Sequence, residues 1–78
     1  METRLSDLEL GQKGVVVRIG GSGAVRRRIM DMGIVRGSKI RVVRRAPLGD
    51  PVEFELRDYN LSLRKREAEN IYVSLEER

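Results

Sequence analysis

Apolar and polar residues alternate along several short stretches of this chain, as they do in strands with one buried face. The alternation is complete over residues 52–57, where Val52, Phe54 and Leu56 would face the core and the charged residues between them the solvent. Four further stretches have apolar residues at alternate positions but follow the pattern less strictly, namely residues 15–19, 39–45, 61–63 and 71–75. The pattern therefore predicts five short strands.

The same period of two assigns a face to the other apolar strand residues. The residues that it turns inward are Ile40, Val42, Ile71, Val73 and Leu75. In the first stretch, Val15, Val17 and Ile19 share one face. The predicted core is mostly aliphatic, because the chain contains a single phenylalanine and no tryptophan.

A helical pattern lies between the first two predicted strands. Its apolar stripe has the spacing i, i+4, i+7 and consists of Val25, Ile29 and Met32. Ser22 or Gly23 can cap the start of this helix, and Gly33 stands where a left-handed residue commonly ends one. We therefore expect a short helix over residues 24–32.

Two shorter helical turns are expected near the ends of the chain. Residues 5–8 would form one, with Leu5 or Leu8 packed under the sheet. Residues 64–69 would form the other, with Ala68 against the core and Asn70 ending it in the left-handed conformation.

Glycine and other turn-forming residues separate these elements. Gly11 and Gly14 are expected to bracket one turn, and residues 58–60 to form a tight turn between two strands. Five short strands with one helix after the first are too few for two packed sheets in 78 residues. We therefore predict one domain over residues 1–78, an all-β, five-stranded antiparallel barrel with small helical insertions, because closure removes exposed edges.

The residue types that are missing exclude several functions. The chain has no cysteine and no histidine, so zinc and iron sites of the usual kinds and nucleophile–histidine pairs are excluded. We expect neither an enzyme nor a bound cofactor or metal. Carboxylates such as Asp31, Asp50 or Asp58 leave a weak ion site open.

The charge balance is mildly basic, with 16 basic and 12 acidic residues and a net charge of +4. This permits nucleic acid or an acidic protein as a partner and requires neither. No apolar run has the length of a membrane span, and the first four residues do not resemble a signal peptide. The expected location is the cytoplasm, without membrane insertion.

The segment 46–51 holds both prolines of the chain and carries a leucine at its centre. Proline cannot pair in a central strand, so this segment should be a turn. Leu48 would then either fold back onto the core or contact a partner. We favour the partner contact, because a turn between Pro47 and Gly49 offers little local sequence to bury a leucine.

The predicted helix carries a second candidate contact. Arg26 and Arg27 point away from its apolar stripe, and Met30 lies near them. The arginines are either a solvated helix face or an anchor for acidic residues or phosphate on a partner. Met30 either folds under a loop or is an exposed contact; next to Leu48, an exposed Met30 and the arginines would form a patch with an apolar centre and a basic rim. Arg64 and Lys65 could also reach a partner. The candidate interface residues are Arg26, Arg27, Met30, Ala46, Pro47, Leu48 and Gly49.

Several motifs occur in an order that resembles one known family. In chain order, they are residues 5–8, Gly11 and Gly14, residues 27–34 with Gly37, residues 46–51, residues 61–65, Glu67-Ala68 and residues 71–73. The chain is similar over nearly its whole length to the FeoA family of bacterial ferrous iron uptake. The resemblance implies an SH3-like barrel. It also implies an accessory role beside the membrane transporter FeoB, through the cytoplasmic part of that transporter, which carries a GTPase domain.

Two other functions remain open at this point. Arginines 26–28, 41, 44 and 45 would suit a small barrel that binds nucleic acid. An aromatic content of 4% disfavours that function, because binders of single strands usually stack bases on aromatic rings. The second open function is that of a metal-responsive regulatory module. The sequence does not determine the oligomeric state.

Overall fold

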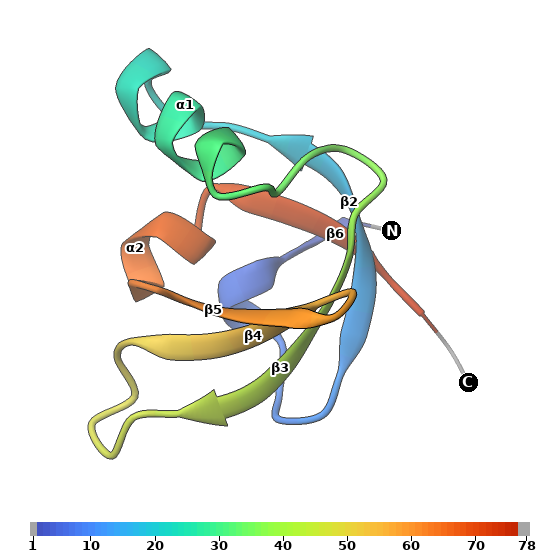
Figure 1. Cartoon of the computed structure of the whole chain (residues 1–78), viewed down its shortest axis with the longest axis vertical. Coiled ribbons are helices and arrows are strands. Elements are labelled where there is room, and N and C mark those ends of the chain that lie inside the picture. Colours follow the sequence, from blue (N-terminus) through green and yellow to red (C-terminus); the bar gives the residue numbers. More distant parts are fainter. Residues whose placement is uncertain (1, 77–78) are drawn as a thin grey trace.

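One antiparallel sheet organises the computed structural model, which describes residues 2–76 (Figure 1). Its strands are β1 (Glu2–Arg4), β2 (Lys13–Ile19), β3 (Lys39–Arg45), β4 (Val52–Leu56), β5 (Tyr59–Leu63) and β6 (Ile71–Leu75). They are ordered β1-β6-β2-β3-β4-β5, and all neighbours are antiparallel. The predicted all-β fold class is confirmed, with one strand more than expected.

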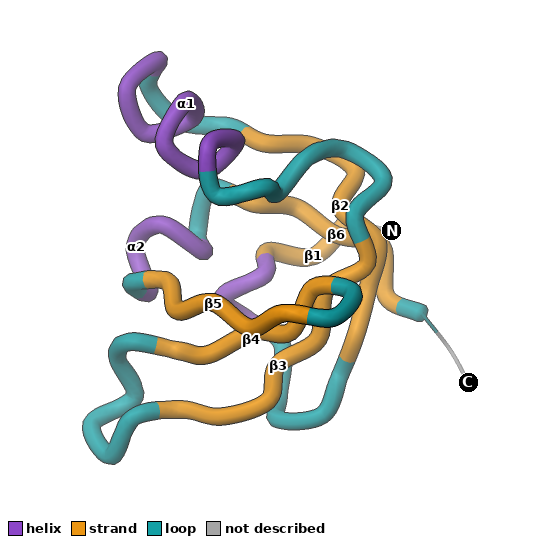
Figure 2. Tube along the Cα trace, in the orientation of Figure 1, coloured by secondary structure: helices purple, strands orange, loops and turns teal. Residues whose placement is uncertain are grey.

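Between residues 2 and 76, three short helices interrupt the strands, and Figure 2 shows their places along the trace. They are the 3-10 helix η1 (Leu5–Asp7) and the α-helices α1 (Gly23–Asp31) and α2 (Lys65–Ala68). The Ser22 hydroxyl accepts a hydrogen bond from the backbone N–H of Val25 at 3.4 Å, and Gly33 has φ +97° after the last turn of α1. Both ends of this helix are thus capped as the sequence predicts.

The additional strand is β1, which pairs with β6 so that Glu2 lies opposite Ser74. Its three residues are all polar or charged, so it carries no alternating apolar pattern. The strand is held by backbone pairing at the sheet edge, and hydrophobic periodicity gives no sign of it.

A single apolar core fills the barrel. Its buried residues are Leu5, Leu8, Val16, Ile29, Ile34, Ile40, Val42, Val52, Phe54, Leu56, Leu63, Ala68, Ile71 and Val73. Val25 and Met32 of the helical stripe pack against this cluster, as does Leu61 of β5. The inward positions predicted for β3 and β4 are confirmed, as is the packing of Ala68, Leu5 and Leu8.

The predicted face of β2 is wrong. Val16 is the fully buried valine, whereas Val15 and Val17 are only partly buried. The register with β6 shifts between Val16 and Arg18, which is a β-bulge with one extra residue in β2. The bulge places Ile19, opposite Ile71, on the same side as Val16, so a strict period of two cannot hold along this strand.

Three predictions for the ends of strands and helices are also wrong. Leu75 is 40% exposed, because it lies at the end of β6 opposite Gly14, which has no side chain to cover it. Gly14 does not bracket a turn but is buried in β2, where an added Cβ would lie 2.8 Å from the Ser74 carbonyl oxygen. Asn70 does not adopt a left-handed conformation, since Arg57 is the non-glycine residue with positive φ within residues 2–76.

The turn between β4 and β5 lies one residue earlier than predicted. It consists of Arg57 and Asp58, and β5 begins at Tyr59. Arg57 has φ +51°, a value that the sequence gives no reason to expect at an arginine. The Tyr59 hydroxyl donates a hydrogen bond to the Met32 carbonyl oxygen at 3.0 Å, so this residue attaches β5 to the end of α1.

Candidate interaction surface

The 46–51 loop connects β3 to β4 and is ordered by its own backbone. Ala46 donates a hydrogen bond to the Pro51 carbonyl oxygen at 3.0 Å, and Gly49 donates one to the Ala46 carbonyl oxygen at 2.7 Å. Gly49 has φ +87°, a conformation that favours glycine. Leu48 is 96% exposed at the tip. The leucine therefore does not plug the core and is presented to the solvent.

The base of this loop is braced by two arginines of β3. Arg44 pairs with Glu53 of β4 at 2.9 Å, and the Arg45 guanidinium donates a hydrogen bond to the Leu8 carbonyl oxygen. A hollow beneath the loop is lined by Arg44, Arg45, Ala46, Pro47, Pro51, Glu53 and Ser62. These contacts hold the base of the loop, so Leu48 projects from a fixed support.

The loop is also joined to α2. The backbone N–H of Lys65 donates a hydrogen bond to the Asp50 carboxylate at 2.9 Å. A hollow between them is lined by Asp50, Arg64, Lys65, Arg66 and Glu69. The cations at the start of α2 thus lie directly beside the loop that carries Leu48.

A second contact joins α2 to α1. One oxygen of Glu67 accepts the Arg64 backbone N–H at 2.9 Å, and the other pairs with Arg28 of α1 at 2.7 Å. The hollow between the two helices is lined by Val25, Arg28, Arg64, Arg66, Glu67 and Asn70. Because both hollows include Arg64 and Arg66, the three segments α1, α2 and 46–51 form one continuous surface.

The candidate residues of α1 lie at one end of that surface. Arg26, Arg27 and Met30 are exposed, and Arg26 donates a hydrogen bond to the Ile19 carbonyl oxygen at 3.3 Å. Figure 1 shows α1 and the 46–51 loop at opposite ends of the longest axis, with α2 between them. A single patch in which Met30 lies next to Leu48 is therefore not formed. The residues that do lie beside the loop are those of α2.

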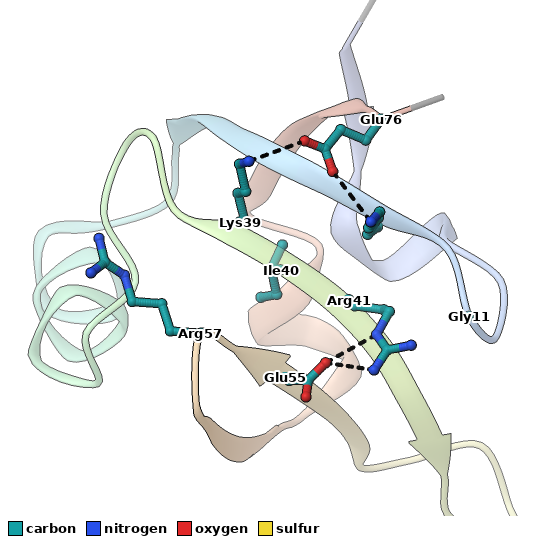
Figure 3. Close-up of a pocket in the computed structure, with 8 residues that line it drawn as sticks. Gly11, Lys39, Ile40, Arg41, Glu55, Arg57 and Glu76 are labelled. Atoms are coloured by element: carbon teal, nitrogen blue, oxygen red, sulfur yellow. Dashed lines mark hydrogen bonds and ion pairs between the residues drawn. The ribbon is translucent and has the colours of Figure 1, made fainter. Parts of the chain in front are cut away.

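A separate pocket opens on the outer face of the sheet, lined by Gly11, Lys13, Lys39, Ile40, Arg41, Glu55, Arg57 and Glu76 (Figure 3). Its charged groups pair with each other. Arg41 binds Glu55 at 2.6 Å, and Glu76 lies 3.6 Å from Lys39 and 3.9 Å from Lys13. Arg57 points away from these pairs in Figure 3. The pocket is therefore a weaker candidate for an anion than the surface beside α2.

The three aromatic side chains differ in how much of their ring surface is exposed. Phe54 is buried, Tyr59 is bonded to Met32, and the Arg18 guanidinium lies 4.0 Å from the centroid of the Tyr72 ring. The hydrogen bond that Glu2 accepts from Arg18 raises the pKa of this guanidinium. Tyr59 is 41% exposed, so within residues 2–76 it is the main ring on which a base could stack, and a single such ring gives the nucleic-acid alternative little support.

Within residues 2–76 there is no group of three or more histidine, cysteine, aspartate or glutamate residues that could hold a metal ion. Among the helices of this part of the chain, none has the length and apolar character needed to cross a membrane.

Comparison with known proteins agrees with this architecture. The model of the FeoA domain family matches residues 3–75. The chain superposes on a FeoA-like protein from Clostridium acetobutylicum with a TM-score of 0.91 and 45% identity, covering 99% of this chain and 90% of that one. It also superposes on a zinc-complexed FeoA from Stenotrophomonas maltophilia, described as a prokaryotic SH3 domain protein, with a TM-score of 0.78 and 29% identity over 95% and 89% of the two chains.

By these similarities, the chain is one of the small SH3-like β-barrel domains. More particularly, the chain belongs to the FeoA family, which is associated with ferrous iron transport.

One relative, from Porphyromonas gingivalis, is a fusion protein that is much longer than this chain. The chain is 50% identical over 72 residues to an Fe(2+) transport protein A/Fe(2+) transporter FeoB fusion protein of that organism. The match covers 92% of this chain and 8% of the fusion protein. The FeoA domain and the FeoB transporter are thus joined covalently in a relative.

Proposed function

We propose that this chain is an accessory component of ferrous iron uptake that binds the cytoplasmic part of a FeoB-type transporter through its 46–51 loop. The exposed side chain of Leu48 carries the proposal, because a leucine held at the tip of an ordered loop is suited to fill a pocket in a partner. The fusion in P. gingivalis supports the choice of partner, since covalent linkage keeps two interacting domains together.

The position of the chain ends also supports this geometry. Glu2 pairs with Ser74, so both ends of the described chain lie at the same edge of the sheet. The 46–51 loop lies on the other side of the molecule in Figure 1. A domain joined to a transporter at either end would therefore still present Leu48 freely.

The direct test measures binding of the cytoplasmic part of the cognate FeoB-type transporter to the wild-type protein and to Leu48→Ala. We expect the substitution to weaken binding by more than about 1 kcal/mol, because truncation of a central apolar anchor usually costs at least this much. Leu10→Ala is the matched control, since Leu10 is also an exposed leucine on a different turn. A folded Leu48→Ala protein that binds as well as wild type would remove the loop from the interface.

A further inference from the structure

The start of α2 carries three consecutive cations, Arg64, Lys65 and Arg66, which we name the α2 cationic strip. All three side chains are exposed. None forms an ion pair within 4.0 Å with a described carboxylate, whereas Arg28, Arg41 and Arg44 each do. The strip therefore holds positive charge that the described residues leave unmatched.

Two carboxylates beside the strip already accept hydrogen bonds from other donors, whereas Glu69, which lines the same hollow, lies in no ion pair within 4.0 Å among the described residues. Asp50 accepts the backbone N–H of Lys65, and Glu67 accepts the backbone N–H of Arg64 while its second oxygen binds Arg28. These bonds involve the backbone N–H groups of Lys65 and Arg64 and the side chain of Arg28, and none involves the side chains of the strip. Their guanidinium and ammonium groups remain available to an anion from outside, and arginine in particular pairs with carboxylates through two hydrogen bonds.

The strip is positioned to act together with Leu48. The bond between Lys65 and Asp50 holds the start of α2 against the 46–51 loop. Arg64 and Arg66 line hollows on both sides of α2, and Lys65 lines the one beside the loop. An apolar tip with cations beside it is the arrangement of an interface with a hydrophobic centre and a polar rim. The complementary surface would have an apolar socket flanked by carboxylates.

We infer that the α2 cationic strip binds a carboxylate-rich segment of the protein partner that receives Leu48. This inference rests on the proposed function and adds the chemistry of the partner surface. The attraction between opposite charges would fix the orientation of the loop and accelerate association, with a rate that falls as salt screens the charges.

The shape of the surface favours an acidic protein segment over a membrane surface or a nucleic acid as the partner. The cations line hollows, which a projecting polypeptide segment can enter and a flat membrane surface cannot. The residues that line these hollows include no aromatic ring, so a nucleic acid would gain no stacking there.

The test uses the double charge reversal Lys65→Glu/Arg66→Glu and the neutral double variant Lys65→Gln/Arg66→Gln. Both positions lie in the first turn of α2, where acidic residues are compatible with the helix, and thermal unfolding checks that the variants fold. The matched control is Arg36→Glu/Arg57→Glu, which changes the net charge equally at exposed residues outside both hollows. Binding to the cytoplasmic part of the cognate FeoB-type transporter is measured at low and high salt.

We expect the reversal to weaken binding about tenfold or more at low salt, the neutral variant to weaken it less, and the differences to shrink at high salt. The control should bind within about twofold of wild type. An equal loss in the control and the reversal would overturn a local role for the strip.

The remaining outcomes separate this inference from the proposed function. If Leu48→Ala loses binding and the charge reversal does not, the loop contact is retained and the inference of an acidic partner segment is wrong. If wild type does not bind the transporter at all, both proposals fall. Binding of wild type to vesicles that contain phosphatidylglycerol, lost in the reversal, would replace the acidic segment by a lipid surface.

Discussion

The carboxylate of Asp50 accepts a hydrogen bond from the backbone N–H of Lys65 at 2.9 Å, which joins the β3–β4 loop to the first residue of α2. The Glu67–Arg28 pair continues this connection from α2 to α1. Segments that are 15 and 39 residues apart along the chain thereby share one surface. The position of Leu48 relative to the α2 cations is consequently fixed by a side chain of its own loop.

Replacement of Asp50 by alanine should loosen the loop without unfolding the domain. The substitution removes one hydrogen bond with a charged acceptor at the surface, for which we expect a loss of about 1 kcal/mol in the free energy of unfolding. Amide hydrogen exchange should accelerate at Lys65 and in the loop and stay unchanged in β6. Unchanged exchange at Lys65 would show that this hydrogen bond does not hold the two segments together.

Truncation should destabilise the domain strongly at Leu63 and hardly at all at Leu48. Leu63 is fully buried, so Leu63→Ala should lower the free energy of unfolding by about 2–5 kcal/mol. Leu48→Ala should change it by less than about 0.5 kcal/mol, because its side chain buries almost no surface in the domain. Chemical denaturation of the two variants checks this. A large destabilisation by Leu48→Ala would mean that the loop folds back in solution.

Strict alternation was the reliable signal for the fold. It located β3 and β4, since Ile40, Val42 and Phe54 face the core in the part of the pairing that precedes the register shift between Val42 and Arg44. It failed where geometry departs from that period, as at the β2 bulge, and where a strand has no apolar residue, as in β1. Both failures depend on backbone pairing between distant segments, which the local sequence does not encode.

The candidate interface was only partly predictable for a related reason. Two prolines and a glycine around Leu48 indicate an exposed turn, and the structure presents that side chain to the solvent. Which helix lies beside the turn depends on how the chain crosses the barrel. The sequence suggested Met30 of α1, whereas the Asp50 hydrogen bond brings Lys65 of α2 to the loop.

Two glycines provide a matched test of the packing. An added Cβ at Gly14 would lie 2.8 Å from the backbone oxygen of Ser74 and 3.1 Å from Val73, so Gly14→Ala should destabilise by about 1–3 kcal/mol. Gly23 begins α1 with no atom within 4 Å of an added Cβ, and Gly23→Ala should stabilise by about 0.4–1 kcal/mol. Thermal denaturation measures both. Similar stability of the two variants would contradict the close approach of β2 and β6.

Glu67 should be the acidic residue whose loss affects α2 most. Its side chain is 13% exposed and uses both oxygens, one for the Arg64 backbone N–H and one for Arg28. Glu67→Ala should therefore cost about 1–3 kcal/mol, because a hydrogen-bonded donor loses its partner in a partly buried site. Glu69→Ala is the control, since that side chain is exposed at the C-terminal end of α2, and it should change stability by less than about 0.5 kcal/mol.

Salt distinguishes the two interactions that Glu67 makes. Screening should weaken its pair with the exposed Arg28 and leave the hydrogen bond from the Arg64 backbone largely intact. Most of the stability difference between wild type and Glu67→Ala should therefore persist in high salt. A difference that disappears there would mean that the ion pair between α1 and α2, and not the closure of the first turn of α2, stabilises this part of the surface.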